Sequence, residues 1–104
     1  MKTIISTPKA PAAIGPYNQA TAFDKLIFTS GQIALNPETM EIVEGGVQEQ
    51  TKQVMENLKA VLEEAGSSFE NVLKTTCYLS DMDNFVAFNE VYSKYFSAET
   101  APAR

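Results

Sequence analysis

Histidine is absent from this chain of 104 residues, and cysteine occurs only once, at Cys77. A disulfide framework is therefore excluded, and the nitrogen ligands most common in zinc sites are missing. Histidine-based triads and histidine general bases are excluded as well. Any catalysis must use carboxylates, hydroxyls, backbone groups, lysines, one thiol and one arginine.

Long apolar runs and clusters of basic residues are also absent. No run of apolar residues is long enough to cross a bilayer, and the apolar stretch after Met1 is too short for a signal peptide. The net charge of −5 offers no basic surface for a phosphate backbone, so nucleic acid is not an expected partner. The composition predicts one cytoplasmic domain over residues 1–104.

Hydrophobic periodicity predicts three short strands, then one long helix, then a fourth strand. Short strands are expected at residues 2–6, 17–23 and 25–30, the last two joined by a tight turn at Asp24-Lys25. An amphipathic helix is expected over 47–65, with Gly66 as its stop. A further strand is expected over 72–79.

A second helix is expected after Asp81 or Asp83, either of which could cap it. Its aromatic stripe is interpreted as core packing, and it consists of Phe85, Phe88, Tyr92, Tyr95 and Phe96. This order predicts an α+β fold in which two helices cover one face of a sheet. The other face would carry little charge, at Ile27, Thr29, Thr75 and Cys77, so an oligomer is expected to cover it.

Arg104 is the only arginine and the last residue of the sequence. A planar guanidinium can grip a carboxylate through two parallel hydrogen bonds, which lysine does poorly. Arg104 is thus the best candidate for binding a small anion, although the position alone also fits a solvated tail charge.

Other residues give weaker signals. Ser30 and Gly31 follow a strand, where exposed backbone N–H groups either bind an anion or form a plain turn. Tyr17 fits a pocket wall or the core equally well. An asparagine within a helix, such as Asn89, usually faces water and has no functional role. Cys77 is interpreted as a small core hydrophobe, because the chain has no histidine to activate its thiol.

Taken together, these segments resemble the Rid family, the reactive-intermediate deaminases. The resemblance covers essentially the whole chain and rests on Pro11-Ala12-Ala13-Ile14-Gly15-Pro16-Tyr17, Phe28-Thr29-Ser30-Gly31-Gln32-Ile33, Asn57-Leu58, Lys74-Thr75-Thr76, Phe85 to Asn89, and Pro102-Ala103-Arg104. It implies a chorismate-mutase-like fold with one mixed sheet, and homotrimers whose sheets form a central barrel. Ligand sites would lie in the clefts between subunits.

The resemblance also implies an activity: hydrolysis of reactive 2-enamines and 2-imines, such as 2-aminoacrylate and 2-iminobutanoate, to 2-oxo acids and ammonia. It implies no cofactor and no metal. By position, Arg104 would grip the substrate carboxylate, the Gly31 backbone would line the pocket with Ser30 and Tyr17 at its wall, and Asn89 would contribute from the neighbouring subunit. The alternative is a non-catalytic module that binds 2-oxo acids in the same cleft.

Relatives of this kind continue beyond the arginine with a strand that carries a glutamate thought to manage the attacking water. We therefore expect the sequence to be part of a longer chain. A third function described for some relatives, RNA cleavage, fits the acidic composition and the lack of histidine poorly.

Overall fold

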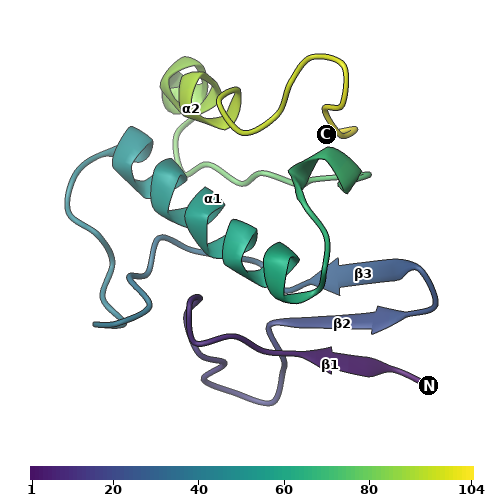
Figure 1. The fold of residues 1–104 in the computed structure, drawn as a ribbon. Coiled ribbons are helices and arrows are strands. Elements are labelled where there is room, and N and C mark those ends of the chain that lie inside the picture. The colour runs from purple at the N-terminus through teal and green to yellow at the C-terminus, as the bar shows by residue number, and fades with distance from the viewer.

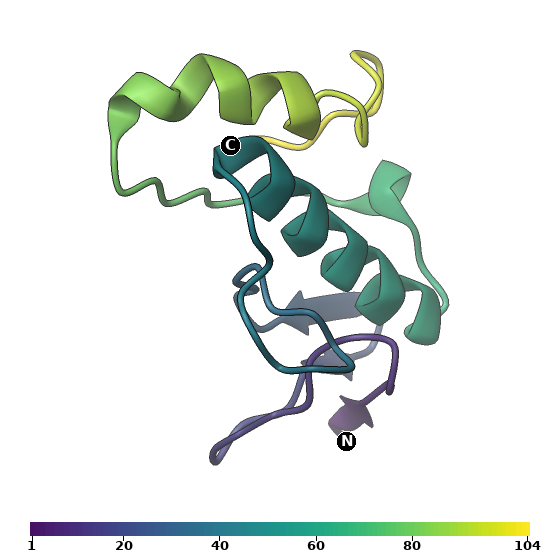
Figure 2. The same ribbon diagram turned by 90° about the vertical axis from the view of Figure 1, so that its left-hand side faces the viewer.

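The computed structural model describes residues 1–104 and arranges them in three layers. A three-stranded sheet lies on one side, the long helix α1 (Val47–Glu64) crosses the middle, and α2 (Phe85–Tyr92) lies on the far side of α1 (Figure 1). The α+β class is thus confirmed. The turned view separates α2 from the sheet (Figure 2), and the contacts of α2 are with α1 rather than with the strands. The prediction that both helices cover the sheet is wrong in this respect.

The sheet has the order β1-β2-β3 and is antiparallel throughout. β1 (Thr3–Ile5), β2 (Ala20–Phe23) and β3 (Leu26–Thr29) lie within the predicted ranges but are shorter. β2 and β3 form the predicted hairpin, and Asp24 adopts a φ of 56° in its turn. Aspartate tolerates this left-handed conformation better than most residues, which explains the tight connection.

α1 has defined ends. At its start, the backbone N–H of Gly46 donates to the Glu49 carboxylate over 3.1 Å, which satisfies one free donor of the first turn. At its end, Gly66 has a φ of +77°, and the N–H of Ser67 donates to the Leu62 carbonyl over 2.8 Å. This pairing is a Schellman motif, so the glycine acts as the predicted stop.

Two apolar clusters lie on opposite sides of α1. The sheet-side cluster consists of Ile5, Ala10, Ala20 and Val61, and Val61 is fully buried. The helix-side cluster consists of Met55, Phe88, Tyr92 and Phe96. The predicted aromatic stripe therefore does form core, because three of its five members are buried there.

A single 3₁₀ turn, η2 (Met82–Asn84), directly precedes α2. The Asp81 carboxylate accepts a hydrogen bond from the Asp83 N–H over 2.9 Å. Asp81 thus caps this turn, and α2 continues from it at Phe85. A similar 3₁₀ turn, η1 (Phe69–Asn71), follows α1.

The strand predicted over residues 72–79 does not form. This segment makes only one isolated parallel bridge, between Lys74 and Ala103. Residues that favour strands still need a neighbouring strand to accept their ladder bonds, and only the short segment at Ala103 supplies one in this chain. The sheet is consequently antiparallel rather than mixed.

The face of the sheet that points away from α1 is apolar and open. Its exposed side chains are Ile4, Phe23, Leu26 and Phe28, of which Phe28 is 65% exposed. Ile27, expected on this face, instead packs against the sheet-side cluster, and Cys77 packs against the helix-side cluster. The expected apolar face exists, but different residues form it. No helix has both the length and the apolarity needed to cross a membrane.

Candidate functional site

The backbone of residue 103 fixes where Arg104 emerges. The N–H of Thr75 donates to the Ala103 carbonyl over 2.9 Å, and the N–H of Ala103 donates to the Leu73 carbonyl over 3.0 Å. These two bonds join the last residues to the segment that precedes α2. They place the Arg104 side chain beside the aromatic face of α2.

The Arg104 guanidinium is held by an amide and two aromatic rings. Nη1 donates to Asn89 Oδ1 over 2.9 Å. The guanidinium carbon lies 4.7 Å from the Tyr92 ring centroid and 5.5 Å from that of Phe85, both within cation–π range. The remaining donors of the fork make no hydrogen bond within the chain, so they are free to bind an anion.

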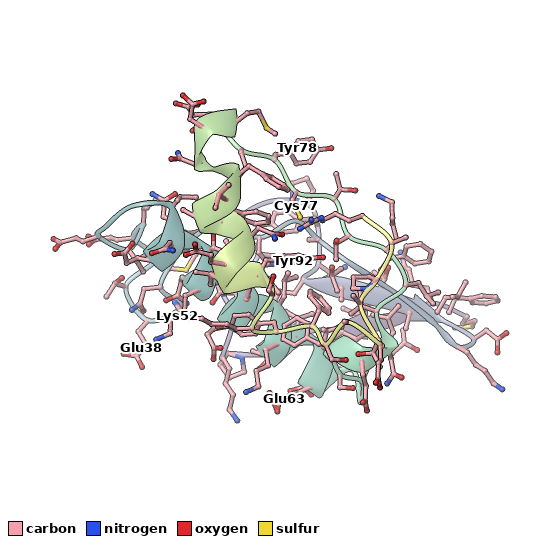
Figure 3. The ribbon with its side chains drawn as sticks, turned by 90° about the horizontal axis from the view of Figure 1, so that it is seen from above. Glu38, Lys52, Glu63, Cys77, Tyr78 and Tyr92 are labelled. Carbon is pink, nitrogen blue, oxygen red and sulfur yellow. The ribbon has the colours of Figure 1, made fainter.

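Tyr92 is itself fixed beneath the guanidinium. The residue is 7% exposed, and its hydroxyl shares a hydrogen bond of 2.7 Å with Thr75 Oγ1. Figure 3 shows Tyr92 on α2, with Cys77 on the segment that runs past this helix. Because the ring cannot rotate freely, the Arg104 fork lies on a rigid platform.

A cavity of about 230 Å³ opens beside Arg104. Its polar lining residues are Arg104, Lys74, Thr75 and Thr76, and its apolar lining residues are Cys77, Leu79, Met82, Phe85 and Phe88. A mainly apolar hollow with a few fixed polar groups is typical of sites for small organic molecules.

A larger hollow of about 440 Å³ lies elsewhere, between the Thr7 loop and α1. Charged side chains dominate its lining, including Glu56, Glu63, Lys9 and Lys59, and only one lining residue is hydrophobic. It offers no apolar wall, so the cavity at Arg104 is the better candidate site. Nowhere in the chain are three or more potential metal-ligating side chains grouped together.

The structure brings together two of the five predicted site residues. Asn89 contacts Arg104 within one chain, which corrects the expectation that Asn89 reaches this arginine from a neighbouring subunit. The physical reason is that the 73–75 segment carries residue 103 back beside α2.

The other three predicted residues do not line the cavity. The Ser30 hydroxyl donates to the Asn18 carbonyl over 2.6 Å, and the exposed Tyr17 hydroxyl accepts a long bond of 3.4 Å from Ile14 N–H. A side chain added at Gly31 would meet no atom within 4 Å, so no contact within the chain requires glycine there.

Three residues of this site have roles that the sequence did not indicate. Tyr92 and Phe85, whose rings contact the Arg104 guanidinium, were interpreted only as core residues. Lys74, which lines the cavity, was given no role. The spacing of Phe85, Asn89 and Tyr92 along one helix face was the available signal, because residues three and four apart are neighbours. The Lys74 ammonium donates to the Thr75 carbonyl over 2.9 Å and to Thr76 Oγ1 over 3.2 Å.

Comparison with known proteins gives consistent matches. The sequence profile described as "Endoribonuclease L-PSP" matches residues 7–104. A RutC family protein of Synechocystis is 58% identical over 97% of this chain and 78% of its own length. The 2-iminobutanoate/2-iminopropanoate deaminase of Mus musculus is 49% identical over the whole chain and 76% of its own length.

Solved structures agree with these matches. A Thermotoga maritima protein, described as a candidate endoribonuclease, is 50% identical and superposes with a TM-score of 0.96. That match covers all of this chain and 81% of the Thermotoga chain. The similarity therefore extends to the whole described fold.

Proposed function

This chain belongs to the Rid family, whose members are also described as endoribonuclease L-PSP proteins, and we propose that it hydrolyses reactive 2-enamines and 2-imines to 2-oxo acids and ammonia. The observation that carries this proposal is the Arg104 guanidinium, fixed at the mouth of a small apolar cavity with part of its fork free. The mouse relative, named as an imine deaminase, supports the same chemistry.

Arg104 would bind the carboxylate shared by all substrates of this class. Two parallel hydrogen bonds from the guanidinium would fix both the position and the plane of the carboxylate. The adjacent imine carbon would then stand in a defined place beside the cavity wall. Fixing it there replaces a diffusive encounter with water by a positioned one, which is a large part of what catalysis of this reaction needs.

The reaction balances without a cofactor. The oxygen of one water forms a bond to the imine carbon, and the C=N electron pair moves to nitrogen, which takes a proton. The C–N bond of the resulting carbinolamine then breaks. Ammonia leaves, the hydroxyl loses its proton, and the 2-oxo acid remains. An enamine first takes a proton at carbon to become the imine.

We include a homotrimer in this proposal. Tyr17, Ser30 and Gly31 lie away from the cavity at Arg104, so a complete site of the predicted composition needs these residues from another copy. The apolar outer face of the sheet would be covered by the same association. Arg104 and Asn89 of one copy would then face Tyr17, Ser30 and Gly31 of its neighbour.

A coupled assay tests the activity. A pyridoxal-phosphate-dependent dehydratase generates 2-aminoacrylate from serine, and pyruvate release is followed with and without this protein. We expect faster pyruvate release in its presence. No acceleration, combined with saturable binding of a 2-oxo acid, would instead indicate a non-catalytic binding module.

A further inference from the structure

Two attachments from different parts of the chain hold Arg104. Its backbone is fixed through Ala103, whose carbonyl accepts a hydrogen bond from the Thr75 N–H over 2.9 Å. Its guanidinium lies over the Tyr92 ring, with 4.7 Å between the guanidinium carbon and the ring centroid. The fork keeps one orientation only while these two attachments keep the same position relative to each other.

Thr75 bonds to both attachments. Besides the backbone bond to Ala103, its Oγ1 shares a hydrogen bond of 2.7 Å with the Tyr92 hydroxyl. Tyr92 belongs to α2 and Ala103 to the last residues of the sequence, so Thr75 joins two segments that meet beneath the guanidinium. All of these bonds lie within one chain, and none of them needs a residue from a neighbouring copy.

The Thr75 hydroxyl is the partner of a buried phenol. Tyr92 is 7% exposed, and its hydroxyl makes no other hydrogen bond within the chain. A buried hydroxyl without a partner costs free energy, so the Tyr92 side chain would swing toward water if the Thr75 hydroxyl were removed. That movement would shift the ring on which the Arg104 guanidinium lies.

We propose that Thr75 is a positioning residue for the anion site: its N–H fixes the backbone before Arg104, and its hydroxyl fixes the ring beneath the guanidinium. This inference rests on the proposed function. When a binding group occupies its competent orientation for only a fraction of the time, the apparent Kd rises by the inverse of that fraction. A looser Tyr92 ring should therefore weaken carboxylate binding even if the Thr75 side chain never touches the ligand.

Equilibrium binding of pyruvate, measured by isothermal titration calorimetry, tests this inference. Thr75→Val keeps the shape of the side chain and the backbone N–H but removes the hydroxyl. We expect the Kd for pyruvate to rise roughly tenfold, the upper end of what loss of one hydrogen bond produces, and Thr75→Ser to restore it. In the pyruvate-release assay, the same variant should change KM more than kcat.

Thr51→Val is the matched control. Thr51 is a buried threonine whose hydroxyl donates to the Val47 carbonyl within α1, and it does not line the cavity at Arg104. Removing this hydroxyl should leave the Kd for pyruvate unchanged.

A double variant separates positioning from direct contact with the ligand. Tyr92→Phe removes the other partner of the same hydrogen bond, so adding Thr75→Val in that background should raise the Kd little further. The double variant leaves neither hydroxyl of this pair without its partner, so it should fold even if Thr75→Val alone does not. An unchanged Kd in Thr75→Val, or an equal rise in both backgrounds, would overturn the role of Thr75.

Binding and turnover are measured separately, so the two proposals can fail independently. A wild type that binds pyruvate but does not speed hydrolysis of 2-aminoacrylate would overturn the proposed function, while the Kd values of the variants would still decide the role of Thr75. A wild type without saturable pyruvate binding would overturn the anion site and the role of Thr75 together.

Discussion

The Arg104 guanidinium donates from Nη1 to Asn89 Oδ1 over 2.9 Å, so one edge of the fork is occupied by an amide of the same chain. The amide carries no charge and does not neutralise the arginine. It fixes the rotation of the guanidinium on the Tyr92 ring while the other donors stay free. In the proposed site, Asn89 would thus position the Arg104 guanidinium.

Replacing Asn89 tests this positioning role. Asn89→Ala should raise KM about tenfold with a smaller change in kcat, because one charge-assisted hydrogen bond that orients Arg104 is lost. Asn89→Asp should be more damaging, since its carboxylate would pair with the fork and compete with substrate. The pyruvate-release assay measures both. Equal KM values in Asn89→Ala and the wild type would contradict the assignment.

Because the outer face of the sheet is apolar and exposed, we expect the chain to self-associate. Phe28→Lys places a charge at a side chain that is 65% exposed in the single chain, so the fold should persist. Sedimentation equilibrium should give about three times 11.4 kDa for the wild type and close to 11.4 kDa for the variant. Ile42→Lys, at an exposed residue outside the three strands, serves as the control. A wild type that remains monomeric would refute the trimer.

Gln19 links the proline-containing loop to the sheet. Its side chain is 3% exposed, accepts a bond from Thr7 N–H, and donates to the carbonyls of Thr7, Ala10 and Pro11. Gln19→Leu would leave these groups buried and unpaired, and we expect it to lower the free energy of unfolding by at least about 3 kcal/mol. Urea denaturation measures the difference. Gln50→Leu, at an exposed position on α1, should have almost no effect.

Tyr95 should make stability fall at high pH. Burial, together with a hydrogen bond to the Glu56 carboxylate and the charge of that carboxylate, raises the pKa of Tyr95 to about 12. In the unfolded chain, the Tyr95 hydroxyl has its ordinary pKa of 10.0. The folded state thus keeps a proton that the unfolded state loses, and this stabilisation is present below pH 10 and disappears between pH 10 and 12.

Thermal unfolding at several pH values checks this linkage. The difference in Tm between the wild type and Tyr95→Phe should shrink as the pH rises from 10 to 12. A constant difference across this range would show that ionisation of Tyr95 is not coupled to folding.

The sequence predicted well those features that depend on local pattern. The helix 47–65, its stop at Gly66 and the hairpin at Asp24 follow from periodicity and turn chemistry, and the structure confirms them. The strand over 72–79 failed because pairing depends on a partner elsewhere in the chain, which residue propensity does not encode.

The candidate site shows the same limit. Arg104 stood out because it is the only arginine, and Asn89 through the family resemblance. Their contact within one chain follows from the bonds between Ala103 and residues 73–75, which join segments far apart in sequence. Tyr92 was missed because an aromatic residue in a core stripe is interpreted first as packing, and only its spacing from Asn89 on the same helix face indicated a second role.

The most direct test of the proposed function is the rate of pyruvate release from dehydratase-generated 2-aminoacrylate with Arg104→Lys in place of the wild type. Lysine keeps the charge but loses the planar fork, so one bond of the bidentate pair disappears. Each hydrogen bond to a charged group contributes about 1.5–3 kcal/mol, so kcat/KM should fall roughly ten- to hundredfold. Wild-type activity in Arg104→Lys would contradict Arg104 as the carboxylate anchor.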